Sequence, residues 1–103
     1  MNLSLVIPVY NEELNLNPLF DAISRAIEPT RKSWEVIFVD DGSTDGSLDL
    51  LRKLAGQQPD HVRVVAFRRN FGQTAAISAG LDYSVGEIIV LLADSSGSRR
   101  RVQ

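Results

Sequence analysis

Four short apolar segments recur along the chain, and a helical pattern separates each one from the next. Segments of this length that are rich in β-branched residues are typical of buried strands. Strands that alternate with helices form parallel sheets through right-handed crossovers, with helices on both faces. We therefore predict an α/β fold of three layers, with a mostly parallel sheet, the element order βαβαβαβ and the strand order 3-2-1-4. The predicted strands are Leu3–Val9, Trp34–Val39, Val62–Phe67 and Glu87–Leu92.

Three helical patterns fill the intervals between these strands. Apolar residues recur on one face of the first two patterns, and a proline or glycine follows each of them. Gly56 is the predicted stop signal of the second helix, because glycine readily adopts the left-handed conformation that ends helices. The predicted helices run from Asn15 or Asn17 to Pro29, from Thr44 or Asp45 to Ala55, and from Gln73 to Ser84.

The composition limits the class of protein. With 103 residues the chain suits one small domain, and its 44% of hydrophobic residues is ordinary for a globular core. The net charge of −2 argues against a nucleic-acid binder that depends on phosphate contacts. Without cysteine, the sequence predicts neither a disulfide framework nor a thiolate metal site. No stretch approaches the ~20 apolar residues of a membrane span, so we expect a soluble domain on the cytoplasmic side.

The final residues differ from the rest of the chain. Residues 95–103 have no apolar periodicity, and a serine- and glycine-rich start is followed by three arginines. We predict a disordered basic tail in which Arg99–Arg101 is solvated; contact with acidic lipid or nucleic acid is the alternative.

Two adjacent carboxylates follow the second predicted strand. Asp40 and Asp41 come directly after four apolar residues, at the end of the strand where open α/β sheets bind their ligands. Gly42 allows a tight turn with close backbone approach, and Ser43 or Thr44 can cap the next helix. A plain turn with a cap is the alternative, but such a turn needs only one carboxylate. The segment therefore predicts a binding site.

The loop after the first predicted strand supplies further polar groups. Pro8 is expected to end ladder pairing at the strand end. Tyr10 offers a flat ring for stacking, and Glu12 offers a carboxylate that can accept from a ribose hydroxyl or a base N–H. Both loops follow neighbouring parallel strands, so these groups should lie together and suit a nucleoside. The alternative is that Tyr10 serves packing and Glu12 leads into a helix.

The loop after the third predicted strand is basic. Its two guanidiniums, an amide side chain and a glycine lie beside a helix N-terminus, an arrangement that suits a phosphate or diphosphate. The alternative for the arginines is a solvated strand end. The only histidine, His61, is predicted to be exposed and inert, which argues against a Ser-His-Asp triad. The residues of the predicted phosphate pocket are Arg68, Arg69, Asn70 and Gly72.

Three ordered motifs together resemble the family 2 inverting glycosyltransferases. The third motif resembles the branch that glycosylates polyprenyl phosphates, such as dolichol-phosphate mannose synthase. The resemblance implies a GT-A, Rossmann-like fold, truncated so that residues 1–94 form its nucleotide-sugar-binding half. The motifs are Leu5-Val-Ile-Pro-Val-Tyr-Asn-Glu-Glu13, Val36-Ile-Phe-Val-Asp-Asp-Gly-Ser-Thr-Asp-Gly-Ser47, and Arg69-Asn-Phe-Gly-Gln73 with Ala79-Gly-Leu-Asp82.

The resemblance also implies roles for individual residues. It implies residues that line the nucleoside site, a contact between the base and one of the paired aspartates, and residues that lie beside the diphosphate and sugar. The implied residues are Pro8, Tyr10 and Glu12 at the nucleoside, Asp40 or Asp41 at the base, Gly42 and Ser43 in the turn, and Arg69, Asn70 and Gly72 at the diphosphate and sugar.

The family's Asp-x-Asp motif implies Mg²⁺ or Mn²⁺ bridging the donor diphosphate, a Lewis-acid role. Here only Asp94 is present, in Leu91-Leu-Ala-Asp-Ser-Ser-Gly97, so we expect metal binding that is weak or lost. The abrupt change to a Ser- and Arg-rich end resembles a shifted reading frame or an engineered truncation.

The implied function is transfer of a sugar from a UDP- or GDP-sugar to a polyprenyl phosphate with inversion, on the cytoplasmic membrane face. One alternative is a non-catalytic nucleotide-sugar-binding fragment, and another is a relative that acts on a polysaccharide or protein. A response-regulator-like acidic pocket is a third alternative. The fourth strand should leave an apolar edge exposed, which predicts self-association or marginal stability.

Overall fold

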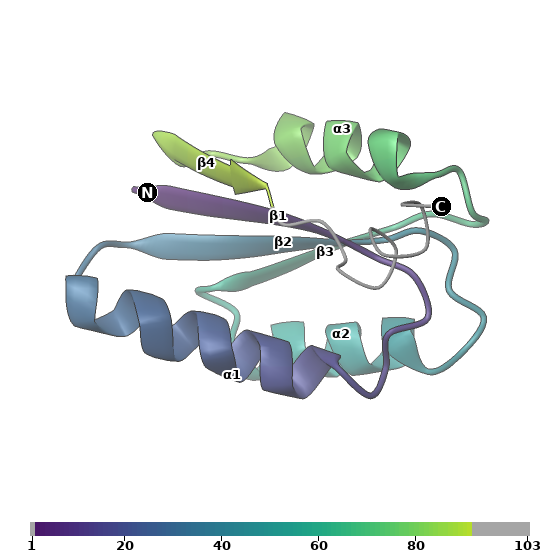
Figure 1. The fold of residues 1–103 in the computed structure, drawn as a ribbon, viewed down its shortest axis with the longest axis horizontal. Coiled ribbons are helices and arrows are strands. Elements are labelled where there is room, and N and C mark those ends of the chain that lie inside the picture. The colour runs from purple at the N-terminus through teal and green to yellow at the C-terminus, as the bar shows by residue number, and fades with distance from the viewer. Residues whose placement is uncertain (1, 92–103) are drawn as a thin grey trace, which may run out of the picture.

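The computed structural model describes residues 2–91, which form one α/β layer structure (Figure 1). All strand pairs are parallel and the strand order is β3-β2-β1-β4, which confirms the predicted fold. The strands are Leu3–Val9 (β1), Trp34–Asp40 (β2), Val62–Ala66 (β3) and Ile88–Leu91 (β4). The helices are Leu16–Ile27 (α1), the 3-10 turn Glu28–Thr30 (η1), Ser47–Gln57 (α2) and Gln73–Tyr83 (α3).

Helices cover both faces of the sheet. Figure 1 shows α1 and α2 on one face and α3 on the other. Because strand side chains alternate between faces, the central strands contribute to two separate apolar clusters. The larger cluster joins the sheet to α1 and α2, and the smaller one includes Ala76 of α3. Gly80 permits the close approach of α3, since a Cβ at that position would lie 2.3 Å from Cγ1 of Val6.

Pro8 lies within the paired part of β1, so the prediction that it ends the ladder was wrong. Pro8 is in register with Val39, and the carbonyl of the next residue, Val9, accepts from the Asp41 N–H at 2.8 Å. Alternate backbone groups of a strand point to opposite neighbours. The missing N–H of Pro8 therefore faces the β4 side, where the described pairing ends at Val6 with Leu91. The proline removes no hydrogen bond between β1 and β2.

The second helix differs from its predicted limits. It begins at Ser47 with Gly46 as its N-cap residue, so the predicted cap by Ser43 or Thr44 was wrong. The Ser47 N–H donates to Asp45 Oδ1 at 2.9 Å in the turn that precedes the helix. Gly56 lies inside the last turn, and the helix ends at Gln57. The predicted helix end at Ala55, before Gly56, was therefore two residues too early.

A buried carboxylate, Glu35, forms a hydrogen-bond network at the amino end of the strands. Glu35 is 2% exposed, and its side chain accepts from Ser4 Oγ at 2.5 Å, from the Val85 N–H at 3.0 Å and from Arg63 Nη1 at 3.2 Å. Burial raises the pKa of Glu35, but the hydrogen bonds and the guanidinium outweigh burial and hold that pKa below its ordinary value. The network ties the connection after α3 to strands β1, β2 and β3.

None of the helices between residues 2 and 91 has the length and apolar character needed to cross a membrane.

Candidate functional site

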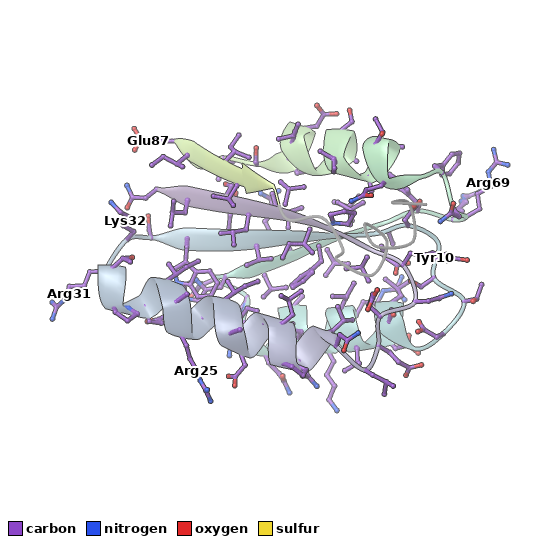
Figure 2. All side chains as sticks on the ribbon, in the orientation of Figure 1. Tyr10, Arg25, Arg31, Lys32, Arg69 and Glu87 are labelled. Atoms are coloured by element: carbon purple, nitrogen blue, oxygen red, sulfur yellow. The ribbon has the colours of Figure 1, made fainter. Side chains whose placement is uncertain are left out.

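Three loops meet at the carboxyl edge of the sheet, one after each of β1, β2 and β3. Figure 2 shows Tyr10 and Arg69 at this same end of the molecule, while Arg31, Lys32 and Glu87 lie at the other end. Carboxyl ends of neighbouring parallel strands share an edge, so the topology brings the three predicted motifs together. We call the segments 10–15, 41–46 and 67–72 the first, second and third site loops.

Asn11 joins the first site loop to the second. Its φ of 53° lies in the left-handed region, which asparagine tolerates better than most residues. Its side-chain oxygen accepts from the Thr44 N–H at 2.8 Å and from the Asp45 N–H at 3.2 Å. Its own N–H donates to Ser43 Oγ at 2.9 Å. One residue therefore fixes the spacing of two loops.

The two glutamates that follow strengthen this junction. The Glu12 N–H donates to Ser47 Oγ at 2.9 Å, and its carboxylate accepts from Asn15 Nδ2 at 2.7 Å. Glu13 Oε1 accepts from the Gly46 N–H at 3.1 Å. On the second site loop, burial raises the pKa of Asp45, but hydrogen bonds, chiefly from Ser47, outweigh burial and lower that pKa below its ordinary value.

Asp40, the last residue of β2, is a buried carboxylate with an unused oxygen. The residue is 1% exposed. Its Oδ2 accepts from the Ser43 N–H at 3.2 Å, whereas Oδ1 has no hydrogen-bond partner among residues 2–91. Leaving a buried charged acceptor unpaired costs free energy, and such groups cluster where a protein meets its ligand. The unpaired oxygen lies at the carboxyl edge of the sheet.

Asp41 has the opposite situation, because its buried carboxylate is fully engaged by the third site loop. Oδ1 accepts from the Phe71 N–H at 2.7 Å, and Oδ2 accepts from the Gly72 N–H at 3.0 Å. Asn70 Nδ2 donates both to Oδ2, at 3.1 Å, and to the Asp41 carbonyl, at 3.2 Å. The carboxylate therefore serves as the acceptor for backbone donors that precede α3.

Gly42 is required by the close contact of the second and third site loops. Its φ is +73°, and a Cβ would lie 2.2 Å from the Arg69 carbonyl carbon and 2.4 Å from the Asn70 nitrogen. Any other residue would have to displace backbone, and it would also be strained in φ. The predicted turn glycine thus has a second function in packing.

Exposed aromatic and basic groups form the rim of the site. The Arg69 guanidinium carbon lies 4.6 Å from the centre of the Phe71 ring, a cation–π contact. Phe71 is 53% exposed and Tyr10 is 39% exposed. Arg68 is exposed as well. The rim therefore offers flat apolar surfaces and positive charge beside a buried carboxylate.

His61 was wrongly predicted to be exposed. The residue is half-buried, its ring stacks on that of Trp34 with 4.1 Å between centroids, and Nδ1 lies 3.0 Å from the Trp34 carbonyl oxygen. The histidine packs against the start of β2, away from the site loops. It has a structural role there.

The predicted site residues of the three motifs lie along the carboxyl edge of the sheet. Asp94, the predicted metal ligand, lies outside the described residues. Within residues 2–91, no three His, Cys, Asp or Glu side chains gather as a metal cluster. Sequence reasoning missed the bridging function of Asn11 and the exposed ring of Phe71. A left-handed tendency at Asn11 was the available signal for the first.

Comparison with known proteins places the chain among glycosyltransferases. Residues 4–95 match the family model described as glycosyl transferase family 2. Dodecaprenyl-phosphate galacturonate synthase of Rhizobium johnstonii is 44% identical over 92 residues, which are 89% of this chain and 27% of that protein. Undecaprenyl-phosphate 4-deoxy-4-formamido-L-arabinose transferase of Pectobacterium carotovorum is 44% identical over 91 residues, 88% of this chain and 28% of that protein.

Solved structures share the fold. Mannosyltransferase PcManGT from Pyrobaculum calidifontis, in complex with GDP-Man and Mn²⁺, has a TM-score of 0.78 and 30% identity. The match covers 89% of this chain and 27% of that chain. Residues 1–349 of S. aureus TarS in complex with UDP give a TM-score of 0.77 at 26% identity, over 90% of this chain and 27% of that chain.

This chain thus spans about a quarter of the length of the curated relatives it matches. The family match extends over most of the chain and includes all three site loops. The chain belongs to glycosyltransferase family 2.

Proposed function

We propose that the three site loops bind the nucleotide of a UDP- or GDP-sugar, within an enzyme that transfers the sugar to a polyprenyl phosphate with inversion. The observation that carries this proposal is the unpaired, buried Oδ1 of Asp40 at the carboxyl edge of the sheet. A base N–H would supply the hydrogen bond that this oxygen lacks. The polyprenyl-phosphate substrates in the names of the relatives support the acceptor class.

The surrounding residues suit the other parts of a nucleotide-sugar. The exposed Tyr10 ring can stack on the base. The Glu12 carboxylate, which accepts from Asn15 Nδ2, can also accept from a ribose hydroxyl. Pro8 is buried in β1, just before the first site loop. Arg69 at the rim can offset the charge of the diphosphate.

We expect the reaction to be a single displacement at the anomeric carbon of the sugar. An acceptor phosphate oxygen attacks the anomeric carbon from the face opposite the nucleotide, as the bond from that carbon to the diphosphate oxygen breaks. The electron pair of the broken bond leaves with the nucleoside diphosphate, whose added negative charge Arg69 would stabilise. The acceptor is already an anion, so the attacking oxygen has no proton to lose. A Mg²⁺ or Mn²⁺ ligand role for Asp94 stays a prediction.

A non-catalytic nucleotide-sugar-binding role is the second candidate. The observation that favours it is the sequence after Asp94, which has no carboxylate two residues away. An acceptor of polysaccharide or protein is the alternative within enzymes. The expected setting of the enzyme is the cytoplasmic membrane face, where polyprenyl-phosphate substrates would be reached.

Calorimetric titration tests the proposal directly. The chain is titrated with UDP, GDP, UDP-glucose and GDP-mannose, each with and without Mn²⁺. We expect one nucleotide series to bind and Asp40→Asn to weaken that binding by tenfold or more, about 1.4 kcal/mol. The control is Asp49→Asn, at an exposed position of α2. Absence of binding by a folded chain, or equal binding by Asp40→Asn, would refute the proposed base contact.

Radiolabelled donor and a short polyprenyl phosphate then separate the two candidates. Labelled lipid product supports the transferase, whereas nucleotide binding without any product favours the non-catalytic role.

A further inference from the structure

The side chains of β4, an edge strand, do little to choose its register. Among the strands of residues 2–91 it pairs with β1 alone, and all of its residues are apolar. Ile88 and Val90 share one face and Ile89 lies on the other, yet all three are exposed. A slip of one residue exchanges the two faces of a strand, and burial of one face is what opposes such a slip. Burial is weak on both faces here, so other contacts are needed to fix the register.

We infer that the register of β4 is set by hydrogen bonds at the amino end of the sheet. The Gly86 N–H donates to Ser4 Oγ at 2.7 Å, and the Val85 N–H donates to Glu35 Oε2 at 3.0 Å. Ser4 Oγ itself donates to Glu35 Oε2 at 2.5 Å. Two consecutive backbone N–H groups ahead of β4 are therefore fixed to β1 and β2. We call Ser4, Glu35, Val85 and Gly86 the register network.

The register network penalises a slip that the side chains of β4 would tolerate. Ser4 is in register with Glu35 on one side and with Ile89 on the other, and Ser4 and Glu35 are both buried. A slip of one residue would move the chain by about 3.3 Å along β1. The two N–H donors would then leave their acceptors, and a buried carboxylate would lose partners that offset its burial.

The connection between α3 and β4 has little freedom to absorb such a slip. A Cβ at Gly86 would lie 2.6 Å from Ser4 Oγ and 2.7 Å from the Ser4 nitrogen, so only glycine allows this approach to β1. At the other end of the connection, Arg63 Nη1 donates to the carbonyl of Tyr83, the last residue of α3, at 2.7 Å. The same nitrogen donates to Glu35 Oε1 at 3.2 Å. The end of α3 and the approach to β4 are thus attached to one carboxylate.

The register of β4 has a consequence at the far end of the sheet. β4 runs parallel to β1, toward the carboxyl edge where the site loops lie (Figure 1). The register therefore decides how far the chain has advanced along β1 when it reaches that edge. Ser4 and Glu35 are positioning residues in this sense, because they act through the backbone of β4. This role does not depend on nucleotide binding.

Disulfide cross-linking measures the register directly, because the chain has no cysteine of its own. Neighbouring strands lie about 4.8 Å apart, a separation that a disulfide can span between residues in register. Leu3→Cys is combined with Ile88→Cys, its native partner, or with Glu87→Cys or Ile89→Cys, its partners after a slip of one residue in either direction. Only the monomer band is scored, so that links between chains are not counted.

In the wild-type background we expect the native pair to link about tenfold faster or more than either slipped pair, whose side chains point to opposite faces. Ser4→Ala removes the hydroxyl that joins Gly86 to Glu35. We expect the ratio of native to slipped linking to fall about fivefold or more. Ser84→Ala is the matched control, since its hydroxyl donates to the Leu81 carbonyl of its own helix, and it should leave the ratio unchanged.

A second control separates register from stability, because an unfolded chain would link all three pairs at similar rates. Leu54→Ala lowers stability in the larger apolar cluster, on the face of the sheet opposite to the register network. It should change the ratio less than Ser4→Ala does. An equal fall in the two variants would assign the effect to unfolding and overturn the inference. A folded Ser4→Ala chain with the wild-type ratio would overturn it as well.

Amide exchange in the wild-type chain decides the matter if Ser4→Ala does not fold. The Ile88 N–H donates to the Asn2 carbonyl at 3.0 Å in the ladder between β4 and β1. We expect the Val85 and Gly86 amides to exchange as slowly as that of Ile88. Exchange of either amide at the rate of an unstructured chain would show that the register network does not hold the connection.

Discussion

The side-chain oxygen of Asn11 lies 2.8 Å from the backbone nitrogen of Thr44, across 33 positions of sequence. This contact joins the loops after β1 and β2, which supply the proposed nucleoside site. Asn11→Ala removes the acceptor and places a less tolerant residue at a φ of 53°. We expect a loss of about 2 kcal/mol in the free energy of unfolding and weaker nucleotide binding.

Asn11→Gly separates the two causes. Glycine accepts the left-handed φ but makes no side-chain hydrogen bond, so it should recover part of the stability and none of the affinity. Urea unfolding and calorimetry supply the two measurements. Wild-type affinity in either variant would show that the bridge does not shape the site.

Among substitutions in the site loops, we expect Gly42→Ala to destabilise the fold most. A methyl group there would lie 2.2 Å from the Arg69 carbonyl carbon, and φ is +73°. We expect a loss of about 3 kcal/mol or more in unfolding free energy, since backbone must move. Gly56→Ala is the matched control: its Cβ meets nothing within 4 Å, and it lies in the last turn of α2. Alanine should raise stability there, by up to about 1 kcal/mol.

The sequence predicted the sheet well because strand patterns are local. Apolar runs between helical patterns gave the four strands and, with right-handed crossovers, the order of the sheet. The three site loops followed, because parallel strands end at a common edge. Pro8 was misjudged because the backbone group it lacks faces β4, which is set by register and not by residue type.

Contacts between distant residues could not be predicted in the same way. The stacking of His61 on Trp34 depends on the pairing of β2 with β3. Alternation alone indicates that Asp40 and Asp41 face opposite sides. Which side carries the third site loop depends on the placement of α3, and no local pattern reports that placement. The roles of the two aspartates therefore needed the structure.

The lowered pKa of Glu35 predicts that the folded chain loses stability in acid. Its pKa is lower in the folded chain than its ordinary value, because the bonds from Ser4, Val85 and Arg63 outweigh burial. The folded state therefore gains stability above the ordinary glutamate pKa, and loses it as pH falls through that value toward the lower folded pKa. Urea unfolding at a series of pH values between neutral and acid measures this loss.

Glu35→Gln should flatten that pH dependence and lower the free energy of unfolding at neutral pH by about 2 kcal/mol. Asp21→Asn is the control, because the Asp21–Arg25 pair is an exposed i,i+4 contact, with side chains 64% and 81% exposed. It should change stability by about 0.5 kcal/mol or less. An acid dependence unchanged in Glu35→Gln would assign the loss to other groups.

The edge strand β4 predicts self-association of this chain. Among residues 2–91, β4 pairs only with β1, and its other edge has no strand partner. Ile88, Ile89 and Val90 are 53%, 43% and 36% exposed, so apolar side chains accompany the unpaired backbone. Such an edge can pair with another chain, and a lysine on it opposes pairing. We expect a sedimentation coefficient that rises with concentration, and Ile89→Lys should remove this rise.

Leu14→Lys is the control, since Leu14 is 87% exposed on the first site loop and lies on no strand. A wild-type chain that stays monomeric across the concentration range would refute pairing through β4, and equal effects of the two lysines would attribute association to net charge rather than to the strand edge.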